Sequence, residues 1–394
     1  MLIMKILFSY IVFVLLSACT SNQVGSDSFE GEIIDINPPL DIDIENLISD
    51  YDTIRLEVTD KSLIRGISQL HILKDKLYIL NEGFDQILIF SDKGKFLANI
   101  KNIGSGPKEY IQINGFEVDP IHNKLLLTDT FSKRLFIYDE FGNQESVISL
   151  DFFPMTIVMN GKEFINFYSG LKKQYTNALM EDYNVHFLDE KGGFIFSQIE
   201  DETLQNIDLY PRQSVDCLED GRFLYQPVLS DIIYSIKDHK VSSLYKLNNK
   251  SNYKLTTSKE KKDITFNFGG ENDFLEKEKE GYLLPWGCLL NLEKYVYINL
   301  STWKNTLYLF YNKQNKTSFT IEPKTLEGND CLKAIFMNTP PRSSFKNNLY
   351  VSPPLDMITA YADKLKEGKL KTYINNTRIE DNPLLFVFSI KKTL

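Results

Sequence analysis

The chain has 394 residues, of which 44 are basic and 53 are acidic, and its formal net charge is −9. This balance argues against nucleic acid or an anionic lipid surface as the main partner. Aromatic residues make up 13% of the sequence, with 27 Phe and 21 Tyr, and strands favour such residues. Because long helical periodicity is nearly absent as well, the composition predicts a mainly β protein.

Residues 1–18 have the pattern of a bacterial signal peptide. Lys5 supplies a positive start, Ile6–Leu16 is an apolar run, and Leu16-Ser17-Ala18-Cys19 resembles a lipobox. The run is too short for a permanent membrane span. In lipoproteins of this type the signal is cleaved before the Cys, so we expect Cys19 to be the lipidated first residue and the membrane anchor. The expected location is the cell envelope, on the periplasmic face or the outer-membrane surface. An ordinary secretory signal with a chance Cys is the alternative.

Residues 19–50 are polar and acidic and contain Pro38 and Pro39, a composition typical of a flexible tether. The folded domain is expected over 51–394. Three further cysteines, Cys217, Cys288 and Cys331, form an odd set, so at least one is unpaired within the chain. No CxxC occurs, and a disulfide framework is not indicated.

One short pattern occurs six times: a polar residue, then alternating aromatic and aliphatic residues, then a small or polar residue. The copies begin at Leu77, Leu125, Phe164, Phe223, Tyr295 and Leu349. Each copy has a predicted strand on either side, and turns such as Asp92-Lys93-Gly94 lead to a further, outer strand. Repeated units of four short antiparallel strands are typical of β-propellers. The sequence therefore predicts an all-β, six-bladed propeller.

The ends of the chain are expected to meet in the sixth blade. Asp52–Val58 alternates like a strand and is predicted to supply the outer strand of that blade, which closes the ring. The first strand of the same blade is expected over Leu332–Met337.

Three insertions interrupt the pattern, at Ser169–Asp182, Ser251–Tyr282 and Pro353–Thr377. Within the last, apolar spacing predicts a short helix over Asp356–Lys366, with Asp356 as its N-cap and Gly368 as its end. Given the propeller topology, we expect all three insertions at one mouth of the central channel.

The stretch Ile103–Tyr110 marks the boundary between the first two predicted blades. Gly104 and Gly106 permit backbone angles that other residues avoid, and Pro107 fixes its own. This GxGPxEY stretch resembles part of an NHL-type repeat, together with Gly115–Asp119, Leu125–Asp129, Arg134–Asp139 and Gly142.

Behind a lipobox, this pattern is similar to the six-bladed β-propeller lipoproteins common in Bacteroidetes, over about Tyr51 to the C-terminus. The resemblance implies a six-bladed propeller and an envelope location. It implies no particular activity.

Ligands of propellers usually bind at the mouth of the channel, so the residues that enter first strands or leave second strands are the candidate ligand-binding residues. By position these are Arg65, Glu82, Glu109, Tyr110, Asp129, Tyr168, Arg212, Gln226, Trp286, Asn299, Trp303 and Arg342. Aromatic and Arg side chains could recognise a protein, peptide or glycan. Each residue also fits a purely structural role; Tyr110, for example, could pack between blades while Glu109 caps a loop amide.

Catalysis has less support in the sequence. The four histidines share no metal-ligand spacing, and no GxSxG nucleophile motif is present. Some six-bladed propellers hold calcium at the channel and act as hydrolases or lyases. The weak candidates for calcium ligands here are Glu82, Asp129, Asn166 and Asn299, since calcium prefers oxygen ligands. The leading hypothesis is a non-catalytic binding module for a protein, peptide or glycan, and the alternative is a calcium-dependent hydrolase or lyase.

Overall fold

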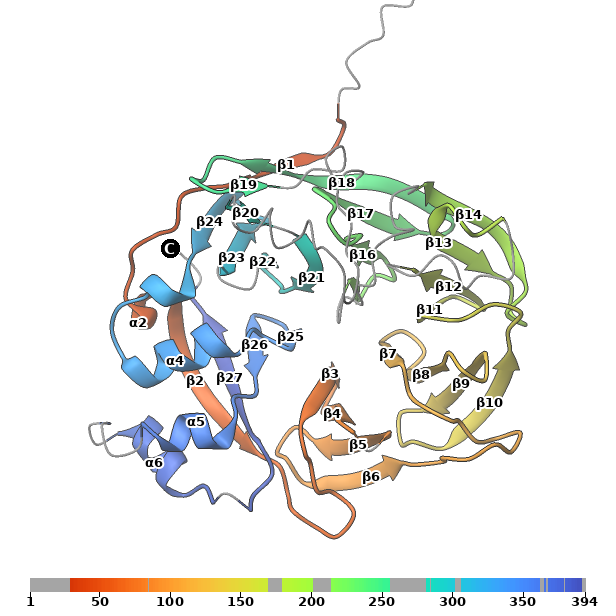
Figure 1. Cartoon of the computed structure of the whole chain (residues 1–394), viewed down its shortest axis with the longest axis horizontal. Coiled ribbons are helices and arrows are strands. Elements are labelled where there is room, and N and C mark those ends of the chain that lie inside the picture. Colours follow the sequence, from red (N-terminus) through yellow and green to blue (C-terminus); the bar gives the residue numbers. More distant parts are fainter. Residues whose placement is uncertain are drawn as a thin grey trace, which may run out of the picture. The chain divides into compact units, whose positions relative to one another are not determined.

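Six antiparallel sheets, one for each predicted blade, surround a common centre in Glu32–Leu394 (Figure 1). The structure is a computed structural model that describes residues 29–83, 85–168, 179–200, 214–255, 281–283, 285–301, 306–361, 365, 368–378 and 380–391. The six-bladed propeller is therefore confirmed.

The blades follow one another along the chain. Blade one contains β3 (Ile67–Leu73), β4 (Lys76–Asn81), β5 (Gln86–Ser91) and β6 (Phe96–Ile100). Blade two contains β7 (Gly115–Asp119), β8 (Lys124–Asp129), β9 (Arg134–Asp139) and β10 (Gln144–Ser149). Blade three contains β11 (Thr156–Asn160), β12 (Glu163–Phe167), β13 (Tyr183–Leu188) and β14 (Phe194–Glu200).

The second half of the ring has the same order. Blade four contains β15 (Val215–Cys217), β16 (Phe223–Tyr225), β17 (Ile232–Lys237) and β18 (Lys240–Asn249). Blade five contains β21 (Pro285–Asn291), β22 (Tyr295–Ser301), β23 (Thr306–Asn312) and β24 (Thr317–Ile321). Blade six contains β25 (Ser343–Phe345), β26 (Asn348–Val351), β27 (Leu384–Ile390) and β2 (Ile48–Arg55).

The remaining elements lie in connections or on blade edges. They are β1 (Glu32–Ile36), the strand pair β19 (Lys254–Leu255) and β20 (Tyr282–Leu283), the helices α2 (Ile44–Leu47), α4 (Asp330–Asn338), α5 (Leu355–Thr359) and α6 (Lys369–Asn375), and the 3-10 helix η4 (Pro323–Thr325). None of the helices in the described ranges is long and apolar enough to cross a membrane.

Packing between blades explains the six-fold apolar pattern. The middle strands are apolar on both faces because each blade is covered by a neighbour on either side, and every residue of β4 is buried. The core accordingly divides into six clusters, and each joins two adjacent blades. Burial of apolar surface at these interfaces, not a single central core, stabilises the ring.

The N-terminal strand closes the ring as predicted. β2 pairs antiparallel with β27, so the last blade takes its outer strand from the start of the domain. The strand extends from Ile48 to Arg55, earlier than the expected Asp52–Val58. The closure removes an open edge and joins segments more than 300 residues apart.

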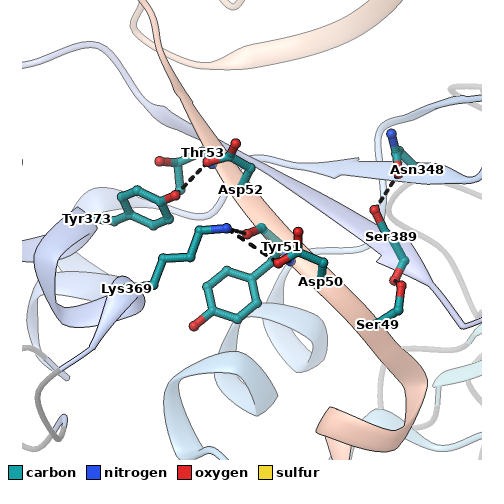
Figure 2. Close-up of polar contacts among 9 residues, drawn as sticks. All are labelled: Ser49, Asp50, Tyr51, Asp52, Thr53, Asn348, Lys369, Tyr373 and Ser389. Carbon is teal, nitrogen blue, oxygen red and sulfur yellow. Dashed lines mark hydrogen bonds and ion pairs between the residues drawn. The ribbon is translucent and has the colours of Figure 1, made fainter.

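The helix α6 covers the outer edge of the closing strand (Figure 2). The Lys369 ammonium group donates a hydrogen bond to the Tyr51 carbonyl oxygen, and its nitrogen lies 5.4 Å from the centre of the Tyr51 ring. The Tyr373 hydroxyl donates to Asp52 Oδ1 at 2.6 Å. Because these contacts occupy one side of β2, they protect a strand that could otherwise pair with another chain.

The expected tether is too long at its C-terminal end. β1 pairs in parallel with β18 and adds a fifth strand to blade four, although its residues had been assigned to the tether. Ile34 and Ile36 are fully buried there, while Glu32 accepts a hydrogen bond from the Tyr311 hydroxyl at 2.5 Å. The acidic composition concealed an alternating apolar pattern in this short segment.

Two predictions in blade six were wrong in detail. Leu332–Met337 lies in helix α4, where Asn329 Oδ1 accepts hydrogen bonds from the Cys331 and Leu332 N–H groups, and the first strand is β25 instead. The single helix expected over Asp356–Lys366 is replaced by α5 and α6. Pro354, not Asp356, is the N-cap of α5, and Gly368 begins α6 instead of ending a helix. A helical insertion in the last blade is nevertheless confirmed.

Candidate functional site

One face of the ring carries the long connections. Strands alternate in direction within each blade, so connections between second and third strands and connections from one blade to the next open on the same face. We call this the insertion face. The three predicted insertions belong to these connections, although 169–178 and 256–280 lie outside the described residues.

Exposed apolar side chains are concentrated on the connections of the insertion face. Seven large apolar residues there are more than one third exposed: Val58, Leu63, Ile103, Ile111, Phe131, Leu179 and Met337. On the connections of the opposite face, the described residues include two, Ile121 and Phe141. The other exposed apolar residues lie on or beside outer strands. This asymmetry marks the insertion face as a candidate interaction surface.

The polar residue that ends the second strand has a structural role in the first three blades. Asn81 Oδ1 accepts a hydrogen bond from the Arg65 N–H at 3.0 Å, and Asn166 Oδ1 accepts one from the Met155 N–H at 3.0 Å. Asp129 Oδ2 likewise accepts from the Ile111 N–H at 2.7 Å. These side chains hold the chain that enters the first strand of the same blade.

Two of the calcium candidates are therefore engaged locally. The fully buried Asp129 also accepts hydrogen bonds from the Phe131 N–H and from both the N–H and the hydroxyl of Ser132. Asn166 and Asn299 are buried near the ends of β12 and β22, while Glu82 is exposed. In the described part of the chain, no group of three or more His, Cys, Asp or Glu side chains is arranged to hold a metal ion.

Glu109 and Tyr110 also have structural roles. Glu109 Oε2 accepts a hydrogen bond from the Gly106 N–H at 2.9 Å, which closes the loop. Tyr110 is fully buried between blades one and two, and its hydroxyl donates to the Asp85 carbonyl oxygen at 2.9 Å. These contacts agree with the structural alternative weighed for both residues.

The reason for glycine in this loop differs from the expected one. Neither Gly104 nor Gly106 has a positive φ. A Cβ atom on Gly104 would instead lie 1.9 Å from Glu109 Oε2. Glycine at 104 is therefore required for the close approach of a carboxylate and not for an unusual backbone angle.

The remaining candidates are of three kinds: exposed residues, residues that are buried or half-buried, and residues outside the described ranges. Tyr168 and Gln226 are buried, and Arg342 is half-buried. Arg65 and Glu82 are exposed together on the insertion face of blade one, where the Glu82 N–H donates to the Gly66 carbonyl oxygen. Cys19, Arg212 and Trp303 lie outside the described residues, as does the side chain of Trp286. The described cysteines, Cys217, Cys288 and Cys331, are all free thiols.

A group of titratable side chains on the inner strands was missed in the sequence. His71 on β3 lies 3.9 Å from Glu117 on β7, measured from Nε2 to Oε2. Burial lowers the pKa of His71 to about 4, and burial, followed by the charge of Asp216, raises the pKa of Glu117. Burial also raises the pKa of Asp216 on β15 to about 7, although its Oδ2 accepts a hydrogen bond from the Asn291 N–H. The sequence did contain a signal for this group, because Glu117 and Asp216 are acidic residues inside predicted first strands.

One protein family matches nearly the whole folded domain. The family described as "Domain of unknown function (DUF4934)" matches residues 32–389. No curated protein matches the chain at a significant level.

Solved structures with the same fold are distant in sequence. A protein of Bacteroides fragilis, named only as a candidate exported protein, is 16% identical and has a TM-score of 0.73, with 91% of this chain and 100% of that chain covered. A member of the DUF4221 family from Bacteroides vulgatus is 11% identical and has a TM-score of 0.52, with 88% and 99% covered. At these identities the likeness shows the fold alone.

Proposed function

The chain belongs to the DUF4934 family, whose description names no function, and from the geometry we propose that it is a non-catalytic binding module that receives a partner on its insertion face. Of the three ligand classes expected from the sequence, a protein, a peptide or a glycan, the exposed apolar side chains favour a protein surface. Apolar residues grouped on one face of a soluble domain are typical of protein–protein contacts.

The asymmetry between the two faces carries this proposal. Phe131, between the second and third strands of blade two, is 64% exposed. Phe141, in the next turn of the same blade, is 60% exposed but lies on the opposite face. Ile111 adds a second exposed side chain beside Phe131, since both backbone N–H groups donate to Asp129. The two phenylalanines therefore form a matched pair for an experiment.

The test compares Phe131→Ser with Phe141→Ser in the full mature chain. Proteins bound in native cells are crosslinked, purified with each variant and quantified by mass spectrometry. A partner of the insertion face is retained by Phe141→Ser and lost by Phe131→Ser, while both variants keep the unfolding temperature of the parent. Equal retention or equal loss of every crosslinked protein would contradict the proposal.

We also propose that the domain is exported and anchored through a lipidated Cys19, as in the NHL-repeat-like propeller lipoproteins that the sequence resembles. The lipobox at Leu16–Cys19 supports this. The likeness to a candidate exported protein of Bacteroides fragilis is consistent with it. The folded unit begins at Glu32, so only a short segment separates Cys19 from the first strand.

The alternative of a calcium-dependent hydrolase or lyase has weaker support. Both carboxylate oxygens of Asp129 already accept hydrogen bonds within blade two, and Asn166 Oδ1 holds the Met155 N–H. A residue that must release such bonds before it can bind an ion makes a poor preformed ligand. The choice between the two functions is tested with calcium in the Discussion.

A further inference from the structure

Three buried polar atoms without partners belong to elements at the junction of blades five and six. Tyr297, Asn299 and Thr339 are all less than one tenth exposed, and the Tyr297 hydroxyl, Asn299 Oδ1 and Thr339 Oγ1 have no hydrogen-bond partner. An unpaired buried polar atom costs free energy comparable to a lost hydrogen bond. Three such atoms at one junction need a common explanation.

Asn299 differs from its counterparts in other blades for a local reason. Asn81 and Asn166, at or near the ends of the second strands of blades one and three, hold an incoming backbone N–H. In blade five the register shifts between Pro285 and Cys288, so β21 enters with an irregularity at this point. Asn299 therefore has no incoming N–H at its Oδ1 atom, although it occupies the same position in its blade.

The other side chains on this face of blade five lie next to Asn299. Asn299 pairs across the strands with Cys288 on one side and Tyr308 on the other. Tyr297 is two residues away along β22, on the same face, and its ring centre lies 5.5 Å from that of Tyr308. Burial raises the pKa of both tyrosines, and the neighbouring Cys288 thiol adds to the rise.

Blade six completes the junction from the other side. The Tyr308 hydroxyl donates to the Phe336 carbonyl oxygen at 2.7 Å, which fixes helix α4 over this face. Thr339 is the C-cap of that helix. Arg342 follows three residues later, directly before β25. Burial raises the pKa of the Cys288 thiol to about 11, and the positive charge of Arg342 opposes this rise. Three unpaired polar atoms and the guanidinium of Arg342 thus belong to elements on the two sides of one blade junction.

We propose that this junction, formed by Tyr297, Asn299, Thr339 and Arg342, is a binding site for a carboxylate group that has an N–H or O–H donor beside it. The guanidinium of Arg342 and the Tyr297 hydroxyl supply donors for the carboxylate. Asn299 Oδ1 can only accept, so it requires a donor on the ligand. Thr339 can serve either group.

The junction lies at the insertion-face end of blades five and six. Asn299 belongs to the end of a second strand, and Thr339 and Arg342 belong to a connection between blades, which are the two kinds of position that define that face. The inference goes beyond the proposed function. It requires only this junction, and it would stand if the exposed apolar residues bound no partner.

Two probes supply the proposed chemistry from different sources. N-acetylglycine places a carboxylate beside an amide N–H, and D-glucuronate places one beside hydroxyl groups. N-acetylglycinamide and D-glucose are their uncharged counterparts. Binding to the full mature chain is measured by calorimetry and thermal shift, with sodium chloride added to match the ionic strength of each probe.

Tyr297→Phe is the decisive variant because it removes a buried hydroxyl that has no partner in the free protein. We expect the free variant to unfold at the same or a higher temperature than the parent, while its affinity for the bound probe falls roughly fivefold, as expected for one hydrogen bond. Arg342→Gln should weaken binding at least tenfold. Tyr308→Phe is the matched control, since its hydroxyl is already bonded to Phe336; it should keep the affinity and lose some stability.

The outcomes separate the alternatives. Binding of one charged probe and not of its uncharged counterpart identifies the source of the carboxylate and supports the site. The proposal is overturned if neither charged probe binds above the chloride control, or if Tyr297→Phe and Arg342→Gln leave the affinity unchanged. Loss of probe binding with retention of the crosslinked partner would contradict this site alone and leave the proposed function standing.

Discussion

The imidazole of His71 and the carboxyl group of Glu117 meet at the centre of the ring, where Nε2 lies 3.9 Å from Oε2. They come from the inner strands of neighbouring blades. Burial lowers the pKa of the imidazole to about 4 and raises that of the carboxyl group. Both shifts disfavour the charged forms, so burial weakens this contact as a salt bridge.

Asp216 should make the stability of the propeller depend on pH. Its pKa is about 7 in the folded chain and near 3.8 when the chain is unfolded. The pKa of Asp216 is higher in the folded chain than in the unfolded chain, so protonation of Asp216 contributes to the stability of the fold. This contribution is fully present at a pH below 3.8 and is lost as the pH rises through about 7. Asp216→Asn cannot ionise, so it removes this loss. The free energy of unfolding of the variant should exceed that of the parent by on the order of 2 kcal/mol at about pH 8 and by much less at about pH 5.

Urea unfolding at the two pH values measures this effect. Asp220→Asn is the control, because the pKa of that nearby, more exposed carboxylate is lowered through its contacts with Arg222 despite partial burial. Its removal should bring no gain at high pH. The prediction is contradicted if both variants gain the same free energy of unfolding, or if the gain of Asp216→Asn does not depend on pH. Either result would show that Asp216 stays ionised in the folded chain.

The sequence was sufficient for the repeat, the blade count and the closure of the ring, because these depend on alternating apolar residues in middle strands. The prediction of strands failed in short segments that lack a clear alternation of apolar and polar residues. β1 has two buried isoleucines in an acidic stretch, and β25 has the three residues Ser343–Phe345, so neither stands out from its surroundings. Helix α4 was mistaken for a strand because an apolar run of this length fits both structures.

The candidate site was harder to predict because its residues act through contacts between blades. Glu109, Tyr110 and Asp129 were chosen by position, but their side chains bond within their own loops. Tyr297 was absent from the candidates because it reads as a core residue of β22. Only the structure shows that its buried hydroxyl has no partner.

Ile34 tests whether residues 32–36 belong to the tether or to blade four. Ile34 is fully buried while its neighbour Ile33 is 49% exposed. Ile34→Ala should therefore destabilise the domain by about 2–4 kcal/mol, as for other large-to-small core substitutions. Ile33→Ala, the matched control, should change the free energy of unfolding by less than about 0.5 kcal/mol. If denaturant unfolding shows similarly small effects for both variants, residues 32–36 belong to the tether and not to blade four.

Cys19 tests the anchor. If the lipobox is used, the mature chain begins at Cys19 and carries the lipid there. Cys19→Ser should then shift the protein from the membrane fraction to the soluble fraction and abolish the lipid mass on the N-terminal peptide. Cys217→Ser is the control, because that thiol lies within the folded domain and is free. A Cys19→Ser variant that remains membrane-bound and fully processed would rule out lipidation at this residue.

Asp129 separates a structural role from a calcium site. Its oxygens accept hydrogen bonds from the Ile111 N–H at 2.7 Å, the Phe131 N–H at 3.0 Å and the Ser132 hydroxyl at 2.6 Å. Asp129→Ala would leave these donors unpaired and should cost on the order of 3 kcal/mol of stability. Asp129→Asn keeps one acceptor oxygen and should cost less.

The calcium dependence of these variants decides between the two roles. If Asp129 is structural, calcium leaves the unfolding temperature of the parent unchanged, and the order of stability, parent above Asn above Ala, is the same with calcium or with EDTA. Calcium bound at this residue would stabilise the parent by mass action and would have no such effect on Asp129→Ala. A calcium-dependent rise in the parent that disappears in Asp129→Ala would therefore favour the hydrolase or lyase over the binding module.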